Sequence, residues 1–466
     1  MITVSNVITI DHPSKELLSW CTKNLRLRNP EYDKKLRMHF WVGKTPEWLY
    51  LYETRGDKLI LPFGVLRNIP LAPEGDPHRN NIYRWDFPVA ESVDYHCKVP
   101  LYDYQEKAVE VVYWKQYGIL QSAAGSGKTQ MGIALIAKLG KRALWLTHTK
   151  DLLTQSKQRA EQYMDPALLG TITEGKVNIG KGITFATVQT MCNLDLAQYK
   201  DYWDVIIVDE CHRVSHSPTT VTQFGKVLNS LAARHKYGLT ATVHRSDGLI
   251  KSTFALLGDV VYTVPAEAVS DKIMRVGICP IPTGVGVSRK FQNPDGTVNH
   301  AKLLNYLAEN EERNRLIVEY ITENRGKPSL ILSDRLEQLS ALMAMLPEDM
   351  QADAVMVNGS MTTKKGKAER EQAIANMRTG EKRYLFASYP LAREGLDIPR
   401  LERLYMASPV SDFAVVTQAI GRIARISEGK ADPICYDFVD DIPHTANAYK
   451  KRCTTYRKNG CYFVER

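Results

Sequence analysis

The chain has 466 residues, 44% of them hydrophobic and 24% charged, a composition typical of globular proteins, and its length predicts about three domains. It contains no apolar run near the ~20 residues that a membrane-spanning helix needs, and Met1–Asp11 lacks the pattern of a secretory signal, so we expect a cytoplasmic protein without membrane contact. Its 61 basic and 52 acidic residues leave a charge of +9, a sign that suits a polyanionic partner.

The first 98 residues are expected to form a small N-terminal domain. Within it, Cys21–Trp48 carries seven basic against three acidic residues, interleaved with Phe40, Trp41 and Trp48. This mixture is typical of surfaces that combine phosphate contacts with base packing. An alternative stays open, in which the aromatic side chains form the core of the domain and the charges its solvated surface.

Prolines mark the end of this domain, because six of them between Leu61 and Pro100 cannot all occupy helix or central strand interiors. We place a boundary near Pro100. After it, short apolar runs alternate with helical stretches, and the expected strands are Gly118–Leu120, Arg142–Leu146, Ile183–Ala186 and Val205–Val208. This alternation predicts parallel-sheet α/β units.

A phosphate-binding loop is the strongest local pattern. Residues 122–129, Ser-Ala-Ala-Gly-Ser-Gly-Lys-Thr, follow an apolar run and precede the helical stretch Met131–Leu139. Glycines let backbone amides converge on phosphate oxygens, Lys128 can reach the terminal phosphates, and Thr129 can offer its hydroxyl to Mg²⁺. The alternative is a Gly/Ser-rich turn that binds nothing, and Ser122 stands where the strict pattern has glycine.

Two adjacent acids supply the partner that such a loop requires. The apolar run Val205–Val208 predicts a buried strand that ends at Asp209 and Glu210. In a nucleotide hydrolase, Asp209 would bind magnesium and Glu210 would orient the attacking water, whereas paired acids elsewhere commonly begin a helix. His212 and His216 lack a third ligand, so we expect no histidine metal site.

The second half begins after an interruption between Pro265 and His300, where Pro280, Pro282 and the turn 293–296 predict a break in regular structure. The α/β alternation then resumes, with strands expected at Ser329–Leu332, Ala354–Val357, Tyr384–Ala387 and Arg403–Met406 and a helix over Lys365–Met377. Basic and aromatic residues from Tyr449 predict a basic C-terminal tail, for which a solvated terminal helix is the simpler explanation. The expected domains are 1–98, 99–275 and 276–446, with the tail at 447–466.

The order of these motifs resembles that of the superfamily 2 helicases over residues 101–426. Residues 101–105 resemble the adenine-reading segment, and 145–149 and 187–190 the motifs that hold the nucleic-acid backbone. Motifs I to VI resemble, in order, residues 125–129, 209–212 with Cys211 in place of the usual alanine, 238–242, 330–335, 394–399 and 418–425. Residues 245–248 resemble the Arg-x-Asp loop of XPB-like and UvsW-like DNA helicases, and 1–98 take the position of the DNA-recognition domain in those enzymes.

The resemblance implies a fold and a set of site residues. The fold is α/β, with two tandem RecA-like parallel-sheet domains, a small N-terminal α+β domain, and ATP and Mg²⁺ held between the RecA-like domains. The implied catalytic residues are Lys128, Glu210, Gln418, Arg422 and Arg425, the last being the preferred arginine finger. The ATP-binding residues are Gln105, Gly125, Ser126, Gly127, Lys128, Thr129, Gly395 and Asp397, and the magnesium ligands are Thr129 and Asp209. The nucleic-acid or coupling residues are Thr149, Thr187, Gln189, Thr240, Thr242, Arg245, Asp247 and Arg335.

The implied function is that of an ATP-dependent DNA helicase or translocase. It would unwind or branch-migrate duplex and branched DNA in replication, recombination or repair, as a monomer of the compact bacteriophage type, in the host cytoplasm if a phage encodes it. Two alternatives stay open: an RNA helicase, which the Arg245–Asp247 loop disfavours, and an ATP-switched DNA-binding subunit without strand separation, which Glu210, Arg422 and Arg425 disfavour. Asp397 and Gln418 stand only 21 positions apart, so any strand-separating wedge must lie outside that interval.

Overall fold

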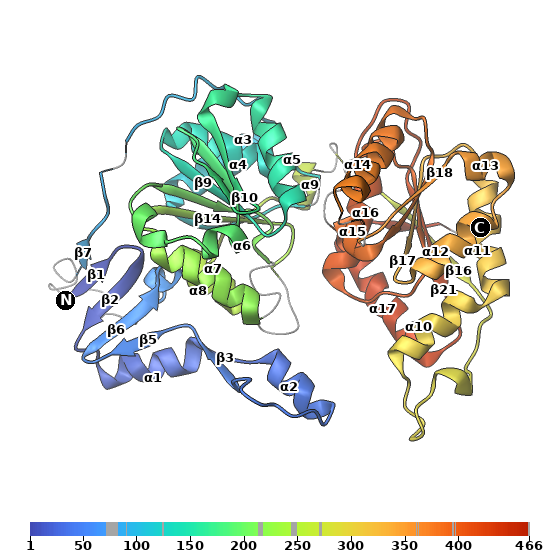
Figure 1. The fold of residues 1–466 in the computed structure, drawn as a ribbon, viewed down its shortest axis with the longest axis horizontal. Helices are drawn as coiled ribbons and strands as arrows, with labels where there is room; N and C mark the ends of the chain where they lie inside the picture. The colour runs from blue at the N-terminus through green and yellow to red at the C-terminus, as the bar shows by residue number, and fades with distance from the viewer. Residues whose placement is uncertain are drawn as a thin grey trace. The chain divides into compact units, whose positions relative to one another are not determined.

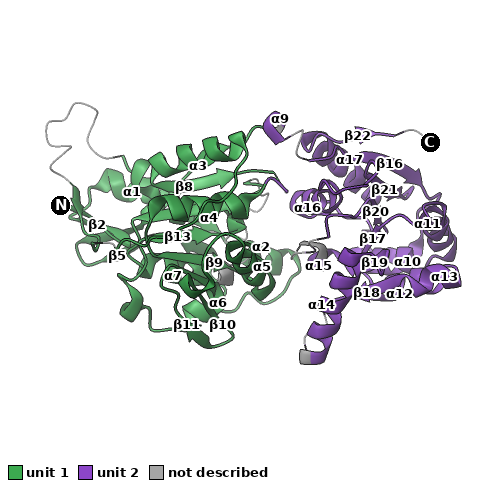
Figure 2. Ribbon diagram, turned by 90° about the horizontal axis from the view of Figure 1, so that it is seen from above, with its two compact units in different colours: residues 1–123, 127–265 green, residues 124–126, 266–466 purple. Residues whose placement is uncertain are grey.

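The computed structural model describes residues 1–70, 83–89, 91–123, 125–212, 218–243, 249–269, 273–359, 361, 363–393, 396 and 398–464. The chain forms two compact units, one of residues 1–123 and 127–265 and the other of residues 124–126 and 266–466 (Figure 2). In the part of the chain described here, no helix is long and apolar enough to cross a membrane.

The first unit begins with a small domain built on a five-stranded sheet. Its strand order is β5 (Glu53–Arg55), β6 (Lys58–Pro62), β2 (Val7–Asp11), β1 (Ile2–Val4), β7 (Tyr83–Trp85), with only the β1–β7 pair parallel. Helix α1 (Lys15–Asn24) buries Leu17 and Cys21 against this sheet. A separate hairpin of β3 (Arg26–Arg28) and β4 (Trp48–Tyr50) carries α2 (Pro30–Arg37) away from the sheet (Figure 1). The predicted N-terminal α+β domain is therefore confirmed.

The rest of the first unit is an eight-stranded sheet. Its order is β11 (Lys176–Asn178), β10 (Leu169–Thr173), β12 (Ile183–Thr187), β9 (Ala143–Thr147), β13 (Val205–Val208), β14 (His235–Thr240), β8 (Tyr117–Gln121), β15 (Val260–Thr263), and β11 alone is antiparallel. Leu144 and Leu146 of β9 pack on one face with α6 (Val188–Cys192), α7 (Pro218–Ser230) and α8 (Ile250–Leu257). Trp145 faces α4 (Lys128–Leu139) on the other, beside α3 (Asp103–Lys115) and α5 (Lys150–Glu161) (Figure 1).

Buried contacts hold the small domain against this sheet. Lys236 of β14 is fully buried, and its Nζ donates to the backbone oxygens of Asn6 (3.1 Å) and Leu228 (2.7 Å). The same ammonium lies 5.0 Å from the ring centroid of Phe63, in the 3₁₀ turn Phe63–Arg67. At Gly64 a Cβ would overlap the backbone of α8, so the two parts meet at backbone distance. The N-terminal domain and the eight-stranded sheet consequently form one body.

The second unit is built on a seven-stranded sheet that is parallel throughout. Its order is β18 (Ala354–Val357), β19 (Tyr384–Ser388), β17 (Ser329–Ser333), β20 (Arg403–Met406), β21 (Ile434–Val439), β16 (Gly277–Pro282), β22 (Tyr462–Phe463). Leu330 and Leu332 pack with α14 (Lys364–Thr379), α15 (Tyr389–Arg393), α16 (Phe413–Ile423) and α17 (Pro443–Lys458). Ile331 packs on the other face with α11 (Glu311–Glu323), α12 (Leu336–Ala344) and α13 (Glu348–Ala352), while α10 (His300–Glu309) packs on the turn at Phe291. The two parallel α/β domains predicted from the sequence are thereby confirmed.

The expectation that Pro280 and Pro282 interrupt regular structure is wrong, because both lie in strand β16. Gly277 N–H donates to Pro433 O, just before β21, and Thr283 N–H to Val439 O at its end, so alternate residues of β16 face that strand. Pro280 and Pro282 fall on the other side, beyond the two residues that pair with β22. Proline has no N–H to donate, but no hydrogen bond between strands is lost at these two positions. The strand therefore tolerates both prolines.

The expected solvated tail is also wrong for its central residues. Helix α17 begins at Pro443, buries Arg452 and Tyr456, and is followed by β22 in the sheet. Arg452 holds both carboxylate oxygens of Asp437 at 2.8 Å, and the Tyr456 hydroxyl donates to the same group at 2.6 Å. The basic C-terminal segment therefore contributes to a buried ion pair, which a count of basic residues cannot detect.

Candidate active site and nucleic-acid edge

The predicted phosphate loop connects β8 to α4. Gly125 and Gly127 adopt φ values of +83° and +80°, which favour glycine, and Gly127 is the N-cap of α4, so Lys128 and Thr129 open the helix. This arrangement places the loop at the positive end of the helix, as a phosphate requires. Ser122 is outside the left-handed region, and its N–H donates to the Thr240 oxygen at 2.9 Å, which explains why glycine is not needed there.

Gln105 lies against this loop from α3. Its side chain is buried, its Oε1 accepts the Tyr102 N–H at 3.0 Å, and a Cβ at Gly127 would overlap its Nε2. The same amide therefore caps α3 and packs on the phosphate loop. Its role as an adenine reader remains a prediction.

The two acids of motif II stand at the end of β13, next to Lys128. Asp209 is 6% exposed, and its carboxylate accepts from the Glu210 N–H (2.9 Å) and the Ser156 hydroxyl (3.3 Å). Burial, and then the charge of Glu210, raise the pKa of Asp209 to about 6. Lys128 Nζ lies 3.9 Å from Glu210 Oε1. A buried carboxylate destabilised by a like charge suits a divalent cation, so these residues fit Mg²⁺ beside a bound triphosphate.

A line of polar contacts leads from Glu210 to the end of β14. His212 Nδ1 lies 3.3 Å from Glu210 Oε2 and 2.9 Å from Thr240 Oγ1. The Thr240 hydroxyl donates to the Thr242 carbonyl at 2.8 Å, so His212 must carry the Nδ1 proton to donate to Thr240. This line links the carboxylate of motif II to motif III through buried side chains. Ser156, which contacts Asp209, stands in no recognised motif, so no local pattern could have predicted its role.

The residues predicted to hold nucleic acid lie along the same edge, because β9, β12, β13 and β14 are parallel and end together. Thr149 caps α5, accepting the Leu152 N–H at 3.4 Å. The Thr187 hydroxyl donates to that of Thr190 at 3.0 Å, and exposed Gln189 donates to the His148 oxygen at 2.9 Å. The ATP-loop residues and the first-domain nucleic-acid residues therefore share one rim of the sheet.

In the second unit, α16 presents the residues predicted from motif VI. Gln418 and Arg422 are four apart, and Arg425 follows the helix and pairs with Ile273 in an isolated bridge. Gln418 is 8% exposed, and its Oε1 has no hydrogen-bond partner among the described residues. Arg422 donates to the Leu396 oxygen at 3.1 Å.

Arg335 begins α12, where its Nε donates to Asn305 Oδ1 at 2.6 Å. Four predicted site residues lie outside the described part of the chain: Arg245, Asp247, Gly395 and Asp397. The same holds for His216.

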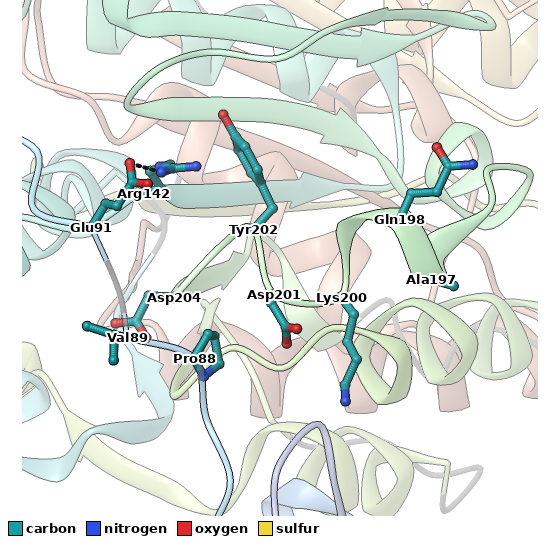
Figure 3. Close-up of a pocket in the computed structure, with 10 residues that line it drawn as sticks. All are labelled: Pro88, Val89, Glu91, Arg142, Ala197, Gln198, Lys200, Asp201, Tyr202 and Asp204. Atoms are coloured by element: carbon teal, nitrogen blue, oxygen red, sulfur yellow. Dashed lines mark ion pairs between the residues drawn. The ribbon is translucent and has the colours of Figure 1, made fainter.

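A pocket at the opposite edge of the eight-stranded sheet is unrelated to these residues (Figure 3). Arg142 and Asp204, which line it, precede β9 and β13, so the pocket lies at the amino ends of the strands. Arg142 pairs with Glu91 there and lies 4.5 Å from the ring centroid of Tyr202. These contacts hold Glu91 against the amino ends of the strands.

Comparison with known proteins gives matches over both units. Residues 98–245 match the model of the type III restriction enzyme res subunit, and residues 312–427 match the helicase conserved C-terminal domain. A relative named putative ATP-dependent RNA helicase L396, from Acanthamoeba polyphaga mimivirus, is 24% identical over 84% of this chain and 73% of its own. A relative named DNA 3'-5' translocase XPB2, from Sulfurisphaera tokodaii, is 25% identical over 80% of this chain and 88% of its own.

Among solved structures, S. cerevisiae Dbp5 bound to RNA and ADP BeF3 has the same fold. Its TM-score is 0.55 at 16% identity, over 78% of this chain and 89% of that one. At this identity the likeness shows the tandem RecA-like architecture alone.

Proposed function

Because the chain belongs to the superfamily 2 helicases of the XPB/UvsW type, we propose that it is an ATP-dependent DNA helicase or translocase acting on duplex and branched DNA. The observation that carries this proposal is the common rim of the first sheet. There Lys128 and Glu210 stand beside the His212–Thr240 contacts, and Thr149 and Gln189 occupy the ends of neighbouring strands. A site of this kind can couple hydrolysis of a nucleotide phosphate to binding of a nucleic-acid strand.

Hydrolysis follows from the placement of the charges. The loop amides and Lys128 would bind the terminal phosphates, and Thr129 and Asp209 would hold Mg²⁺, which would supply positive charge to the phosphates. Glu210 takes the proton of the attacking water, and His212 Nδ1 lies 3.3 Å from Glu210 Oε2. Gly395 and Asp397 of motif V are kept as proposed nucleotide-binding residues on the resemblance alone. Arg425, with Arg422 and Gln418, is proposed to stabilise the charge on the phosphates during turnover.

The Thr240–Thr242 segment is where we propose that ATP hydrolysis is coupled to movement on DNA. Motif II touches this segment through His212, and residues 245 and 247 follow it directly in the chain. We therefore propose that Arg245 and Asp247 couple ATP use to strand movement, while Thr149, Thr187, Gln189 and Arg335 hold the backbone. The process served would be replication, recombination or repair, by unwinding or branch migration, with the chain acting as a monomer.

DNA is preferred over RNA because the name of the XPB2 relative specifies DNA, in agreement with the Arg245–Asp247 loop. The name of the mimivirus relative favours RNA and makes an RNA helicase the second candidate. ATP turnover should be measured with single-stranded, duplex, forked and four-way DNA and with RNA, using Lys128→Ala as the inactive control. Stimulation by duplex or branched DNA well above that by RNA is expected. Stimulation by RNA alone would contradict the proposal.

A further inference from the structure

The β3–β4 hairpin and α2 form an arm, residues 26–50, whose end is apolar and open to solvent. Helix α2 has no buried side chain. The exposed apolar residues include Leu36 and Met38, followed by Phe40 at 59% and Trp41 at 88% exposure. Phe40 and Trp41 are therefore not core residues of the small domain, and the core alternative is wrong for them. Figure 1 shows α2 at the far end of the arm, away from the five-stranded sheet.

The tip of this arm, residues 38–45, is a fixed pair of turns. Phe40 N–H donates to Lys35 O at 2.8 Å and His39 N–H to Leu36 O at 3.1 Å, the hydrogen bonds of a Schellman helix end. His39 takes the left-handed conformation there, with φ +53°. Lys35 Nζ also reaches across to the Thr45 hydroxyl at 2.6 Å. The aromatic side chains are thus held outward by a rigid backbone, so little ordering entropy is lost when they bind.

The tip also rests on a fixed base. Asn29 is buried and crosses the arm, since its Nδ2 donates to Pro46 O at 2.7 Å and its N–H to Glu47 O at 3.1 Å. Arg28 pairs with Asp33 (2.7 Å) and with Glu47. Such cross-links join the two sides of the arm below its tip.

The charge left over on the arm is positive. Its acids are neutralised locally, since Asp33 and Glu47 pair with Arg28, and Glu31 pairs with Lys35 at 3.4 Å. Lys34, Arg37 and Lys44 are exposed and make no ion pair with a carboxylate among the described residues. Beside the tip lies an open hollow lined by Trp41, Lys44, Leu49 and Gln223 of α7. The arm therefore combines flat aromatic faces with unpaired cations and an open space.

We propose that Phe40 and Trp41 stack on unpaired bases where duplex DNA opens, while Lys34, Arg37 and Lys44 contact the phosphates of the same strand. Stacking uses the face that every base offers, and the cations select a polyanion over a neutral protein surface. The inference rests on the proposed function and gives the helicase a wedge outside the short interval between Asp397 and Gln418. Because the small domain and the eight-stranded sheet form one body, the tip would move together with motif I.

The test compares binding of a forked DNA, which has unpaired bases, with binding of a blunt duplex of the same length, by fluorescence anisotropy. The double variant Phe40→Ala/Trp41→Ala should lower affinity for the fork about tenfold or more, with little change for the duplex. Phe40→Ala/Trp41→Phe should restore most of the preference. Lys34→Ala/Arg37→Ala/Lys44→Ala should weaken binding to both DNAs and flatten the salt dependence. Trp114→Ala, at an exposed tryptophan of α3, is the matched control and should change nothing.

Equal losses on fork and duplex, or no loss on either, would overturn the inference. So would a dimer in sedimentation that Phe40→Ala/Trp41→Ala disrupts without any effect on DNA binding, since the tip would then hold a second copy of the chain. ATP turnover stimulated by saturating single-stranded DNA should stay unchanged in the tip variants. If that stimulation is absent from the unaltered protein, the proposed function has failed rather than the role of the tip.

Discussion

Glu210 illustrates how one residue serves both the fold and the chemistry. Its φ of +47° lies in the left-handed region, which a non-glycine residue adopts at a cost of roughly 1–3 kcal/mol. In this conformation the Glu210 carboxylate lies between Lys128 and His212. The Glu210 N–H donates to Asp209 Oδ1. Strain of this kind persists where the surrounding structure enforces it, and here the fixed group is the one assigned to water activation.

Substitution of Glu210 tests that assignment. Glu210→Gln keeps the size and a hydrogen-bonding group but cannot take a proton, so ATP should still bind while turnover falls about 100-fold or more. Lys128→Ala should weaken binding as well as turnover, because it removes a cation from the phosphates. Nucleotide titration and single-turnover kinetics separate the two effects. Normal turnover by Glu210→Gln would remove Glu210 from the mechanism.

Cys211, where alanine is usual, has a structural counterpart in Gly238 of β14. A Cβ at Gly238 would lie 2.7 Å from Cys211 Sγ, inside contact distance. We therefore expect Gly238→Ala to destabilise the protein by about 1–3 kcal/mol, and the loss to shrink when Cys211→Ala is added. Denaturant unfolding of the two single variants and the double variant measures this coupling. Additive losses would show that the two positions are independent.

At the level of elements, the terminal helix α17 depends on a buried charge. Arg452 and Asp437 are both almost fully buried and form a two-point ion pair, and Arg452 also donates to the Val410 oxygen at 2.7 Å. Arg452→Leu would leave Asp437 without its cation, a change that costs about 3–5 kcal/mol in comparable buried pairs. Lys451→Ala, one residue earlier and exposed, is the matched control and should be near neutral. Equal stability of the two variants would mean that α17 is not anchored by this pair.

The elements show where sequence patterns suffice. The strand at Val205–Val208 and the helix over Lys365–Met377 were predictable, because the spacing of apolar residues and the turn residues beside an element can be read from a short stretch of sequence. Strand β16 was not predictable, since whether a strand can contain Pro280 depends on the side on which the neighbouring strand lies. The expectation of a solvated Arg452 is wrong for the same reason, because its partner Asp437 comes from another element.

The candidate site divides in the same way. Motifs I and II were found because glycine, lysine and paired acids stand in a fixed local order. Ser156 beside Asp209 could not be found, because no local pattern marks it. The roles given to Gln105, Arg422 and Arg425 remain predictions, as do the domain bounds chosen from prolines and turns.

For the molecule as a whole, Lys236 fixes the N-terminal domain to the first parallel sheet. Burial lowers the pKa of Lys236 from its usual value near 10.5 to about 7. Between these values the unfolded chain binds the proton and the folded chain does not, so folding stability rises with pH over this window. Below pH 7 Lys236 is protonated in both the folded and the unfolded chain, so the destabilisation caused by its burial is at its maximum and no longer changes with pH.

Comparison with Lys236→Met isolates this effect. From pH 7 to 9.5 the unfolding free energy of the unaltered protein should rise relative to that of Lys236→Met, by up to about 1.4 kcal/mol per pH unit. Denaturant unfolding at several pH values measures the difference. Parallel curves for the two proteins would show that Lys236 does not titrate in this range.

The central claim is that ATP hydrolysis at Lys128 and Glu210 moves the protein along DNA. Displacement of a third strand from triplex DNA reports such movement directly, because the strand leaves only when something travels along the duplex beneath it. The unaltered protein should displace the strand with ATP, and Glu210→Gln should bind the same DNA without displacing it. If the unaltered protein hydrolyses ATP on this DNA at full rate but leaves the strand in place, the chain is an ATP-switched binding subunit and the claim is contradicted.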